Sequence, residues 1–426
     1  MISKMKAPPE NYTLGPIRGE KGGEGSRIAI VFNGSPLFTG DAASGESNIR
    51  RYIIENDMLE AVVGLPDQMF YNTGIYTYIW IVTNRKNPQR QGKVQLINGT
   101  DFAWKMKKSL GDKRKKLGEG IDGEPDHITE LTKVYADFKH DDKRKLSEIQ
   151  TNVELPKKAV RDLNQEHFVS KIFANHEFAY LKITVERPLR LNFAVTDERI
   201  AGFTESTYFK NLAVSKKRKD KATIEKEITK GKAQQQAILK VLDGMKVNYT
   251  NGELIKNRDT FEAQLKDKFN VSTDFNKEYK WDAALKKAML THGALAERDT
   301  SADICTDSKG KPEPDAELRD TENVPLPLDI QLPLPVDYEN KKQNKGKVDK
   351  TELLELVKEH CEDYLKKEVL PYRDDAWVDH SKIKLGYEIP FNRHFYQYQP
   401  PRDLAEIEAE IKGLEQEIMD MLAEVV

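Results

Sequence analysis

The amino-acid sequence predicts an α/β domain followed by a mostly helical region. Between residues 27 and 86, short runs of β-branched and aromatic residues alternate with one helical pattern. Between residues 223 and 268, charged segments carry apolar residues three and four positions apart, which is typical of helices. The C-terminal segment repeats apolar residues in alternating steps of three and four, as a coiled-coil helix does. These three patterns set the predicted fold class.

The α/β part begins with a strand, a helix and two further strands. Arg27–Phe32 is expected to be a buried strand, and Ser47–Asn56 a helix with its first residue as N-cap. Leu59–Leu65 and Ile75–Thr83 are the next two strands. A strand–helix–strand succession is typical of a parallel pair joined by a crossover. The loop before the last strand is too short for a helix, so we expect that strand to run antiparallel to its neighbours.

Composition excludes several classes of protein. Hydrophobic residues make up 38% and charged residues 32% of the chain, which suits a soluble protein that buries a core. No apolar run reaches the roughly 18 residues of a membrane span. We therefore expect no membrane anchor. Cys305 and Cys361 lie far apart and show no metal-ligand spacing, so we expect a cytoplasmic protein without a metal or a disulfide framework. The net charge of −2 leaves room only for a local nucleic-acid-binding patch.

A Gly-rich run near the N-terminus does not have the context of a phosphate-binding loop. Gly19–Gly25 is followed by a predicted strand, whereas a phosphate loop needs a strand before it and a helix after it. No Gly-x-x-x-x-Gly-Lys-Ser/Thr run occurs anywhere in the chain. We therefore interpret the run as a flexible loop and expect no ATP-driven motor.

Four stretches of the α/β part resemble a known family. They read IVFNGSPLFTGDA, GESNIRRYI, LP-x-x-MFYNTGI and WIVTNRK, and further similar stretches lie at Tyr180–Phe193 and Val369–Leu404. They resemble the modification subunit of type I restriction–modification systems, which transfers a methyl group from S-adenosylmethionine to adenine N6 in DNA. The resemblance implies that the α/β part is the second half of a Rossmann-like methyltransferase sheet.

The two chemical motifs of that family are absent from this sequence. There is no Asp-Pro-x-x-Gly-x-Gly-type donor loop and no Asn-Pro-Pro-Phe/Tyr; Ala7-Pro8-Pro9-Glu10 and Gln399-Pro400-Pro401-Arg402 lack both the asparagine and the aromatic. The amide orients the adenine amino group and the aromatic stacks on the extruded base. We therefore expect no catalytic and no cofactor-binding residues, and no S-adenosylmethionine binding by this chain alone. The chain is expected to correspond to the C-terminal half of a modification subunit.

One base-facing element of the family has a counterpart here. Phe70, Tyr71 and Asn72 lie in the loop between the second and third predicted strands, followed by Gly74. The resemblance implies that an aromatic of this loop packs against the extruded base, a contact of about 1–3 kcal/mol. The structural alternative is that Phe70 packs beneath the loop and Gly74 makes the turn. The sequence does not choose between the two rings.

A basic run follows a further predicted strand at Val94–Ile97. Clustered Lys and Arg side chains neutralise DNA phosphates, and each contact adds salt-dependent affinity. A solvated protein face is an equal competitor for such a run. The candidate DNA-backbone residues are Lys105, Lys107, Lys108, Lys113, Arg114, Lys115 and Lys116.

The remainder of the chain is expected to be helical and extended. We predict a partial methyltransferase domain at 1–195, a helical insertion and linker at 196–320, and a helical assembly tail at 321–426. Residues 300–320 are the predicted linker, and 323–337 are expected to be extended because of their prolines. His380 and His394 lack metal-ligand spacing and are expected to be packed or hydrogen-bonded. The nearby aromatics, expected to pin this segment to the protein body, are Tyr387, Phe391, Phe395, Tyr396 and Tyr398.

The last predicted helix carries a narrow apolar seam. A core-packing helix normally shows a wider stripe, so the seam favours a partner helix. In the resembling family, modification subunits assemble with a DNA-reading specificity subunit, a second modification subunit and a restriction subunit, and the specificity subunit offers such a helix. The seam residues are Leu404, Ile407, Ile411, Leu414, Ile418, Met421 and Val425.

Three functions are compatible with these patterns. The first is the methyltransferase subunit of a type I system, acting on adenine N6 in DNA with S-adenosylmethionine. The second is a catalytically incompetent assembly module, which the absent motifs favour for the isolated chain. The third is a nucleic-acid-binding scaffold unrelated to methylation, which leaves the long resemblance unexplained. The DNA target is not encoded in this chain, because the specificity subunit reads it.

Overall fold

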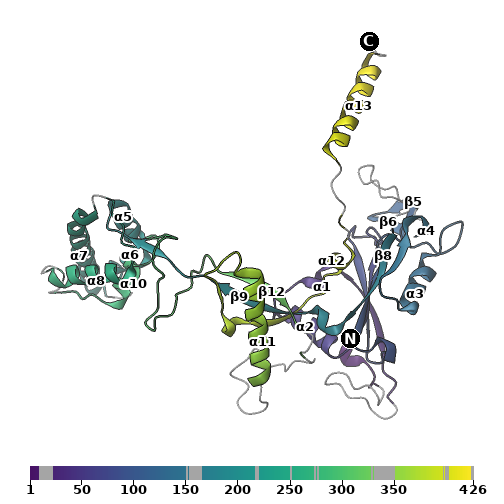
Figure 1. The fold of residues 1–426 in the computed structure, drawn as a ribbon, viewed down its shortest axis with the longest axis horizontal. Coiled ribbons are helices and arrows are strands. Elements are labelled where there is room, and N and C mark those ends of the chain that lie inside the picture. Colours follow the sequence, from purple (N-terminus) through teal and green to yellow (C-terminus); the bar gives the residue numbers. More distant parts are fainter. Residues whose placement is uncertain are drawn as a thin grey trace. The chain divides into compact units, whose positions relative to one another are not determined.

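The computed structural model describes residues 1–8, 23–149, 152, 166–215, 220–249, 252–272, 275, 278–327, 330, 351–396, 398 and 403–423, with the backbone alone at 351–354. The chain divides into two compact units (Figure 1). Unit 1 comprises Met1–Leu181, Pro325–Lys347 and Lys384–Val426, and unit 2 comprises Lys182–Val324 and Val348–Ile383. This division differs from the three consecutive segments predicted, because the chain enters unit 2 and returns to unit 1 twice.

A six-stranded sheet forms the centre of unit 1. Its strands, in spatial order, are β1 (Arg27–Asn33), β3 (Thr77–Thr83), β2 (Leu59–Leu65), β4 (Lys93–Asn98), β8 (Glu166–Ala174) and β7 (Asp142–Lys145). Every residue of β2 is buried, as its continuous apolar run requires. The predicted strands therefore form, and β2 lies inside the sheet.

The third predicted strand is antiparallel to both of its neighbours, as expected. β3 pairs antiparallel with β1 and with β2, so β1 and β2 run parallel to each other with β3 between them. The expected parallel orientation of β1 and β2 is found, but the two strands do not pair directly, because β3 lies between them. β1 is also not fully buried: it lies at the end of the described sheet, and most of its residues are exposed.

The helices of unit 1 pack on this sheet or extend from it. They are α1 (Ser35–Phe38), α2 (Gly45–Glu55), α3 (His127–Asp137), α4 (Leu146–Ile149), α12 (Phe391–Phe395) and α13 (Leu404–Ala423). The N-cap of α2 is Ser44, whose hydroxyl accepts a hydrogen bond from the amide of Ser47. The predicted cap, Ser47, thus lies inside the helix, because the helix begins one residue after Ser44.

The C-terminal stretch of the resemblance packs into unit 1 through α2. The guanidinium of Arg50 donates to the carbonyl of Tyr387 over 2.6 Å, and the Tyr387 hydroxyl donates to Glu55 over 2.8 Å. Tyr387 belongs to β14 (Lys384–Tyr387), and burial raises the pKa of its hydroxyl. Tyr387 and Phe391 are buried and do pin this segment, whereas Tyr396 and Tyr398 are each 72% exposed and do not.

The helices of unit 2 include those predicted between residues 223 and 268. They are α5 (Asp197–Glu205), α6 (Thr207–Leu212), α7 (Lys221–Met245), α8 (Arg258–Val271), α10 (Ala283–Met289) and α11 (Thr351–Tyr364). The strands of this unit are β9 (Ala179–Glu186), which begins in unit 1, β10 (Leu191–Phe193), β11 (Ala296–Arg298), β12 (Asp320–Pro325) and β13 (Trp377–Val378). Phe193 and Phe261 stack at a centroid distance of 5.1 Å in the core of this unit.

The segment predicted as a linker is part of the unit 2 structure. Asp315 is only 2% exposed and pairs with Arg298 over 2.7 Å. Cys305 is buried, and its amide donates to the carbonyl of Leu189. The acidic and polar composition of residues 300–320 therefore reflects an ordered loop held by ion pairs. Most of the predicted extended stretch 323–337 lies outside the described residues.

Candidate nucleic-acid interface

Two predicted site segments leave the sheet at the same edge. β2 pairs parallel with β4, so their carboxyl ends lie together. The loop after β2 carries Phe70, Tyr71 and Asn72, and the hairpin of β5 (Trp104–Leu110) and β6 (Lys113–Lys116) follows β4. Ligands of open α/β sheets bind outside the carboxyl ends of the strands. The topology thus gathers the candidate base-facing loop and the basic run at the edge where such sheets bind ligands.

Backbone hydrogen bonds join the hairpin to the loop. The amide of Asp112 donates to the carbonyl of Tyr71 over 3.1 Å. The amides of Arg114 and Lys115 donate to the carbonyl of Gln68 over 3.0 and 3.1 Å. The ammonium of Lys115 also pairs with the carboxylate of Asp67 over 2.5 Å. The hairpin and the loop therefore form one structural element.

The turn of the hairpin depends on a glycine. Gly111 has φ +65°, and a Cβ at this position would lie 2.7 Å from the carbonyl oxygen of Tyr71. Such a distance is shorter than any ordinary contact, so the two backbones approach this closely only because Gly111 has no side chain. Gln68 and Gly111 were not among the predicted site residues. The Leu-Gly-Asp-Lys turn between two basic runs was the available signal for a hairpin.

The structure distinguishes the two aromatic rings of the loop. Tyr71 is 63% exposed, and the ammonium of Lys113 lies 5.1 Å from its ring centroid. Phe70 is half-buried, and its backbone forms an isolated bridge with Thr73, while Asn72 is exposed. Tyr71 is thus the ring that solvent and a ligand can reach, and Phe70 matches the structural alternative more closely.

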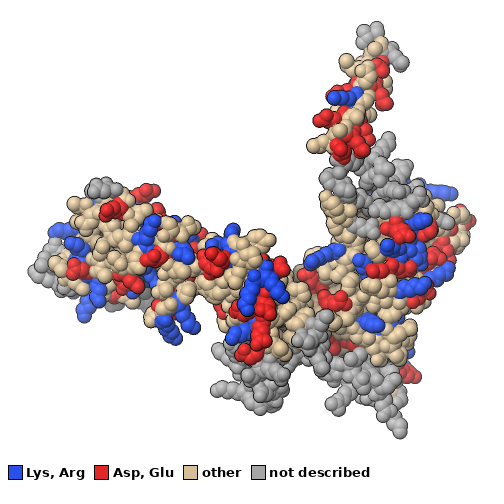
Figure 2. All heavy atoms as spheres, in the orientation of Figure 1, with Lys and Arg blue, Asp and Glu red and all other residues tan. Residues whose placement is uncertain are grey.

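The seven basic side chains of the hairpin are not equivalent. Lys115 and Lys116 pair with the carboxylates of Asp67 and Glu124, and the second pair raises the pKa of Lys116. Among the described residues, the other five have no carboxylate partner; they are Lys105, Lys107, Lys108, Lys113 and Arg114. These five lie on the β5–β6 hairpin. Figure 2 shows basic and acidic side chains interspersed over unit 1.

The predicted partner seam lies on an unburied helix. None of the described residues of α13 is buried, and Ile411, at the middle of the seam, is 51% exposed. Val425 lies outside the described residues. Within the described structure the seam therefore does not serve as a core-packing stripe.

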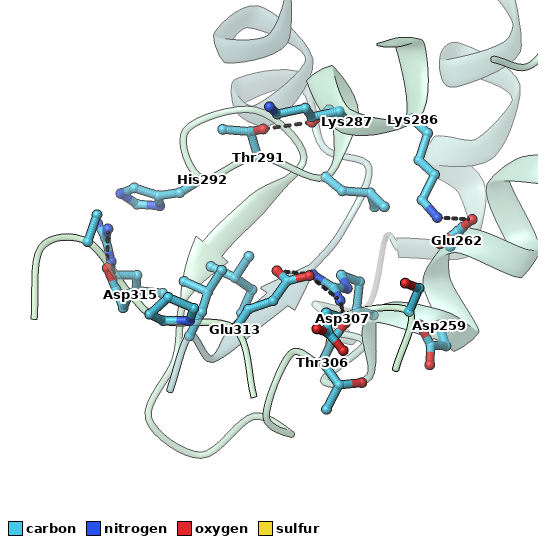
Figure 3. A pocket seen from close by; sticks show the side chains of 18 of the residues that line it. Asp259, Glu262, Lys286, Lys287, Thr291, His292, Thr306, Asp307, Glu313 and Asp315 are labelled. Atoms are coloured by element: carbon cyan, nitrogen blue, oxygen red, sulfur yellow. Dashed lines mark hydrogen bonds and ion pairs between the residues drawn. The ribbon is translucent and has the colours of Figure 1, made fainter. Parts of the chain in front are cut away.

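Unit 2 has a pocket of about 850 Å³ whose charges largely neutralise one another (Figure 3). Arg258 pairs with Glu313 over 2.7 Å, and Lys286 pairs with Glu262 over 2.6 Å. These two cations therefore already have carboxylate partners within the pocket. Among the described residues there is no cluster of three His, Cys, Asp or Glu side chains that could hold a metal. In the same part of the chain, no helix combines the length and the apolar character that crossing a membrane requires.

Comparison with known proteins points to one family. Residues 20–172 match the family model described as N-6 DNA Methylase. The methylase subunit of type I restriction enzyme MjaVIII from Methanocaldococcus jannaschii is 32% identical over 113 residues, which cover 26% of this chain and 18% of that protein. The HindI methylase subunit from Haemophilus influenzae is 33% identical over 87 residues, 20% of this chain and 18% of that protein. The resemblance stated from the sequence is confirmed.

The matched region is a small part of this chain and a small part of each relative. The chain spans less than a fifth of the length of these curated relatives. A solved methyltransferase subunit of a type I restriction–modification system from Streptococcus thermophilus covers 27% of this chain and 21% of its own, with 26% identity and a TM-score of 0.21. That overlap is too small for a comparison of the two folds.

Proposed function

We propose that this chain is a DNA-contacting and assembly part of a type I modification subunit, which methylates adenine N6 with S-adenosylmethionine. The observation that carries the proposal is the N-6 DNA Methylase match over residues 20–172. The matched stretch includes the loop and the hairpin that meet at the carboxyl edge of the sheet.

The strand order supports the methyltransferase part of this proposal. The resemblance implies a strand–helix–strand unit followed, after a short loop, by a strand that runs antiparallel to its neighbours. β3 follows β2 after a short loop and pairs antiparallel with both β1 and β2. We therefore interpret the sheet as the second half of a Rossmann-like methyltransferase domain.

The interface proposed for DNA combines two kinds of contact. Tyr71 would stack on a base that has left the duplex, as an exposed aromatic ring at the sheet edge can do. The five cations without carboxylate partners would neutralise flanking phosphates. Lys115 and Lys116 would contribute less, because their charge is already compensated.

The partner proposed for α13 is the specificity subunit. An unburied helix with a seam at heptad spacing fits a partner helix better than solvent, because each large apolar residue gains roughly 1.5–3 kcal/mol on burial. A second modification subunit and a restriction subunit complete the assembly that the resemblance implies. In this proposal α13 is the coiled-coil arm that the sequence predicts.

A catalytically incompetent assembly module is the second candidate. The sequence lacks the donor loop and the Asn-Pro-Pro-Phe motif, so no residue of this chain is proposed to bind S-adenosylmethionine or to orient the adenine amino group. In this candidate the chain binds DNA and the specificity subunit without methyl transfer.

The experiment that tests the proposal is co-purification with the specificity subunit of the same system, followed by DNA binding and methyl-transfer assays with labelled S-adenosylmethionine. A complex that binds the target DNA supports the proposal. Methyl transfer to adenine should then occur only when a polypeptide that carries the two motifs is added. Methyl transfer by this chain without such a polypeptide would exclude the second candidate, the catalytically incompetent assembly module. Failure to form any complex with the specificity subunit, with folded protein, would overturn the proposal.

A further inference from the structure

One residue from the C-terminal part of unit 1 contacts both stems of the loop that carries Tyr71. This loop, residues 66–76, leaves the end of β2 and enters the start of β3. Next to its two ends, Gly64 of β2 and Tyr78 of β3 face each other as a register pair. Phe391, the first residue of α12, lies against this pair.

The contact with β2 depends on the absence of a side chain at Gly64. A Cβ at this position would lie 2.9 Å from Cζ of Phe391, which is shorter than an ordinary contact. On the β3 side, the rings of Phe391 and Tyr78 meet edge to face, with centroids 5.1 Å apart and planes at 72°. The Tyr78 hydroxyl also donates to the side-chain oxygen of Asn392 over 3.4 Å. The start of α12 therefore packs on both strands where the loop begins and ends.

The ring of Phe391 is confined where it lies. Phe391 is only 3% exposed, and Tyr78 is 5% exposed. The residues just before α12 are fixed to α1, because the amide of Ile389 donates to the carbonyl of Leu37 over 2.9 Å. Close packing leaves a buried ring little room to move. The separation of the two loop stems is therefore coupled to the position of this ring.

The loop itself has few buried contacts. Within residues 66–76, every residue after Pro66 is half-buried or exposed. Its carbonyl groups at Gln68 and Tyr71 accept the hydrogen bonds from the β5–β6 hairpin. A segment with so little buried surface opens readily, so its geometry depends on the points where it is anchored. These anchors are the hairpin on one side and the two stems on the other.

We infer that Phe391 is a positioning residue, which holds the two stems of the loop and thereby sets where the ring of Tyr71 lies. Phe391 lies outside residues 20–172, the stretch that matches the N-6 DNA Methylase model. The use of this positioning, to place Tyr71 against a base, rests on the proposed function. The packing of Phe391 on the stems does not, so the two can be tested separately.

Hydrogen exchange of the full chain, measured by mass spectrometry, tests the packing. Phe391→Leu keeps an apolar side chain but removes the ring that meets Gly64 and Tyr78. Exchange should become about tenfold faster in residues 66–76 and in residues 112–115, whose amides bond to the loop carbonyls. Thermal unfolding followed by circular dichroism verifies that the variant is folded.

Phe178→Leu is the matched control. Phe178 is 2% exposed, as buried as Phe391, and its ring contacts Phe173 and His394. The same substitution there should lower the melting temperature without faster exchange in the loop. Equal exchange of residues 66–76 in the two folded variants would overturn the inference.

Gly64→Ala tests the same contact with the ring of Phe391 intact. The new Cβ displaces the ring, so exchange in the loop should again become faster. On the Phe391→Leu background the same change should have no further effect, because the Cζ atom that it would meet is gone. Additive effects of the two substitutions would overturn the inference.

A fluorescent base tests the consequence for Tyr71. Single-stranded DNA that contains 2-aminopurine should lose fluorescence when the base stacks on Tyr71, and Tyr71→Ala should remove this quenching. Phe391→Leu should reduce the quenching as Tyr71→Ala does, whereas Phe178→Leu should retain it. Faster exchange with unchanged Tyr71-dependent quenching would overturn the positioning role. Equal quenching by wild type and Tyr71→Ala would instead refute the proposed base contact, and the exchange comparison would still decide whether Phe391 holds the loop.

Discussion

The amide of Asp112 donates a hydrogen bond to the carbonyl of Tyr71 over 3.1 Å, joining the turn of the basic hairpin to the exposed ring of the preceding loop. The two residues belong to segments that the sequence presents as separate features. With the bonds to Gln68, this contact makes the position of the Tyr71 ring depend on the hairpin. Phosphate contacts by the hairpin would therefore set the orientation of the ring toward a base.

Gly111→Ala should lower the affinity for DNA. The new Cβ would meet the Tyr71 carbonyl at 2.7 Å, so the hairpin must move away from the loop. Gly123→Ala is the matched control, because Gly123 also has positive φ, at +81°, but a Cβ there meets no atom within 4 Å. Both variants should lose about 1 kcal/mol of stability through backbone strain. Equal DNA affinity of the two in fluorescence anisotropy would contradict the coupling of hairpin and loop.

Tyr71→Ala should reduce methyl transfer about 5- to 150-fold in an assembled subunit that contains the donor-binding motifs, because a base loses a stacking partner of about 1–3 kcal/mol. Tyr71→Phe keeps the ring and should retain most activity. Phe70→Ala should mainly lower the melting temperature, since Phe70 is half-buried. If Tyr71→Ala assembles normally and methylates DNA at the wild-type rate, Tyr71 does not stack on the base.

Replacing Lys105, Lys107 and Lys108 together by Ala should weaken DNA binding and flatten its salt dependence. Each lost phosphate contact lowers the slope of log affinity against log salt by about 0.9. The paired replacement of Lys115 and Lys116 by Ala is the comparison, because both side chains already have carboxylate partners. Titrations at several salt concentrations measure both slopes. An equal change in the two variants would indicate a diffuse charge effect.

Ile411→Asp should abolish co-purification with the specificity subunit. The substitution places a carboxylate in the middle of the seam, where burial of an unpaired charge is costly. Ala409→Asp adds the same charge to the opposite side of α13 and should leave the complex intact. Circular dichroism of both variants controls for the fold of the rest of the chain. An undiminished complex with Ile411→Asp would show that the seam is not the contact surface.

The stability of unit 1 should fall as the pH drops below 6.5. Burial, with a smaller contribution from the positive charges of Lys171 and Arg393, lowers the pKa of His394 to about 4. Between pH 6.5 and 4 the unfolded chain binds a proton that the folded chain does not, so stability is complete above pH 6.5 and is lost on acidification. The loss by pH 5 should be about 2 kcal/mol.

His394→Gln should remove that part of the pH dependence. The ring of His394 packs at 4.1 Å from the ring of Phe173, so the substitution also lowers stability uniformly at all pH values. His140→Gln is the control, because the His140 side chain is about half exposed. Thermal midpoints measured from pH 7.5 to 5 distinguish a change in slope from a constant offset. Parallel profiles for wild type and His394→Gln would refute the assignment.

The sequence by itself determined strands β1 to β4 of unit 1, the antiparallel direction of β3, helices α7 and α8 of unit 2 and the family resemblance. These features depend on local periodicity and on residue type, which a single chain displays directly. The N-cap of α2 was misplaced by three residues, because Ser44 and Ser47 are chemically equivalent as caps and only the backbone of the folded helix separates them.

Only the tertiary structure decided which segments meet. The parallel pairing of β2 with β4 brings Tyr71 and Lys113 together, and nothing in the spacing of those residues encodes that pairing. Folding also buried Asp315 against Arg298 in a segment whose composition is that of a linker. The physical reason is the same in each case: long-range contacts satisfy charges and backbone groups that look solvent-exposed when the chain is considered locally.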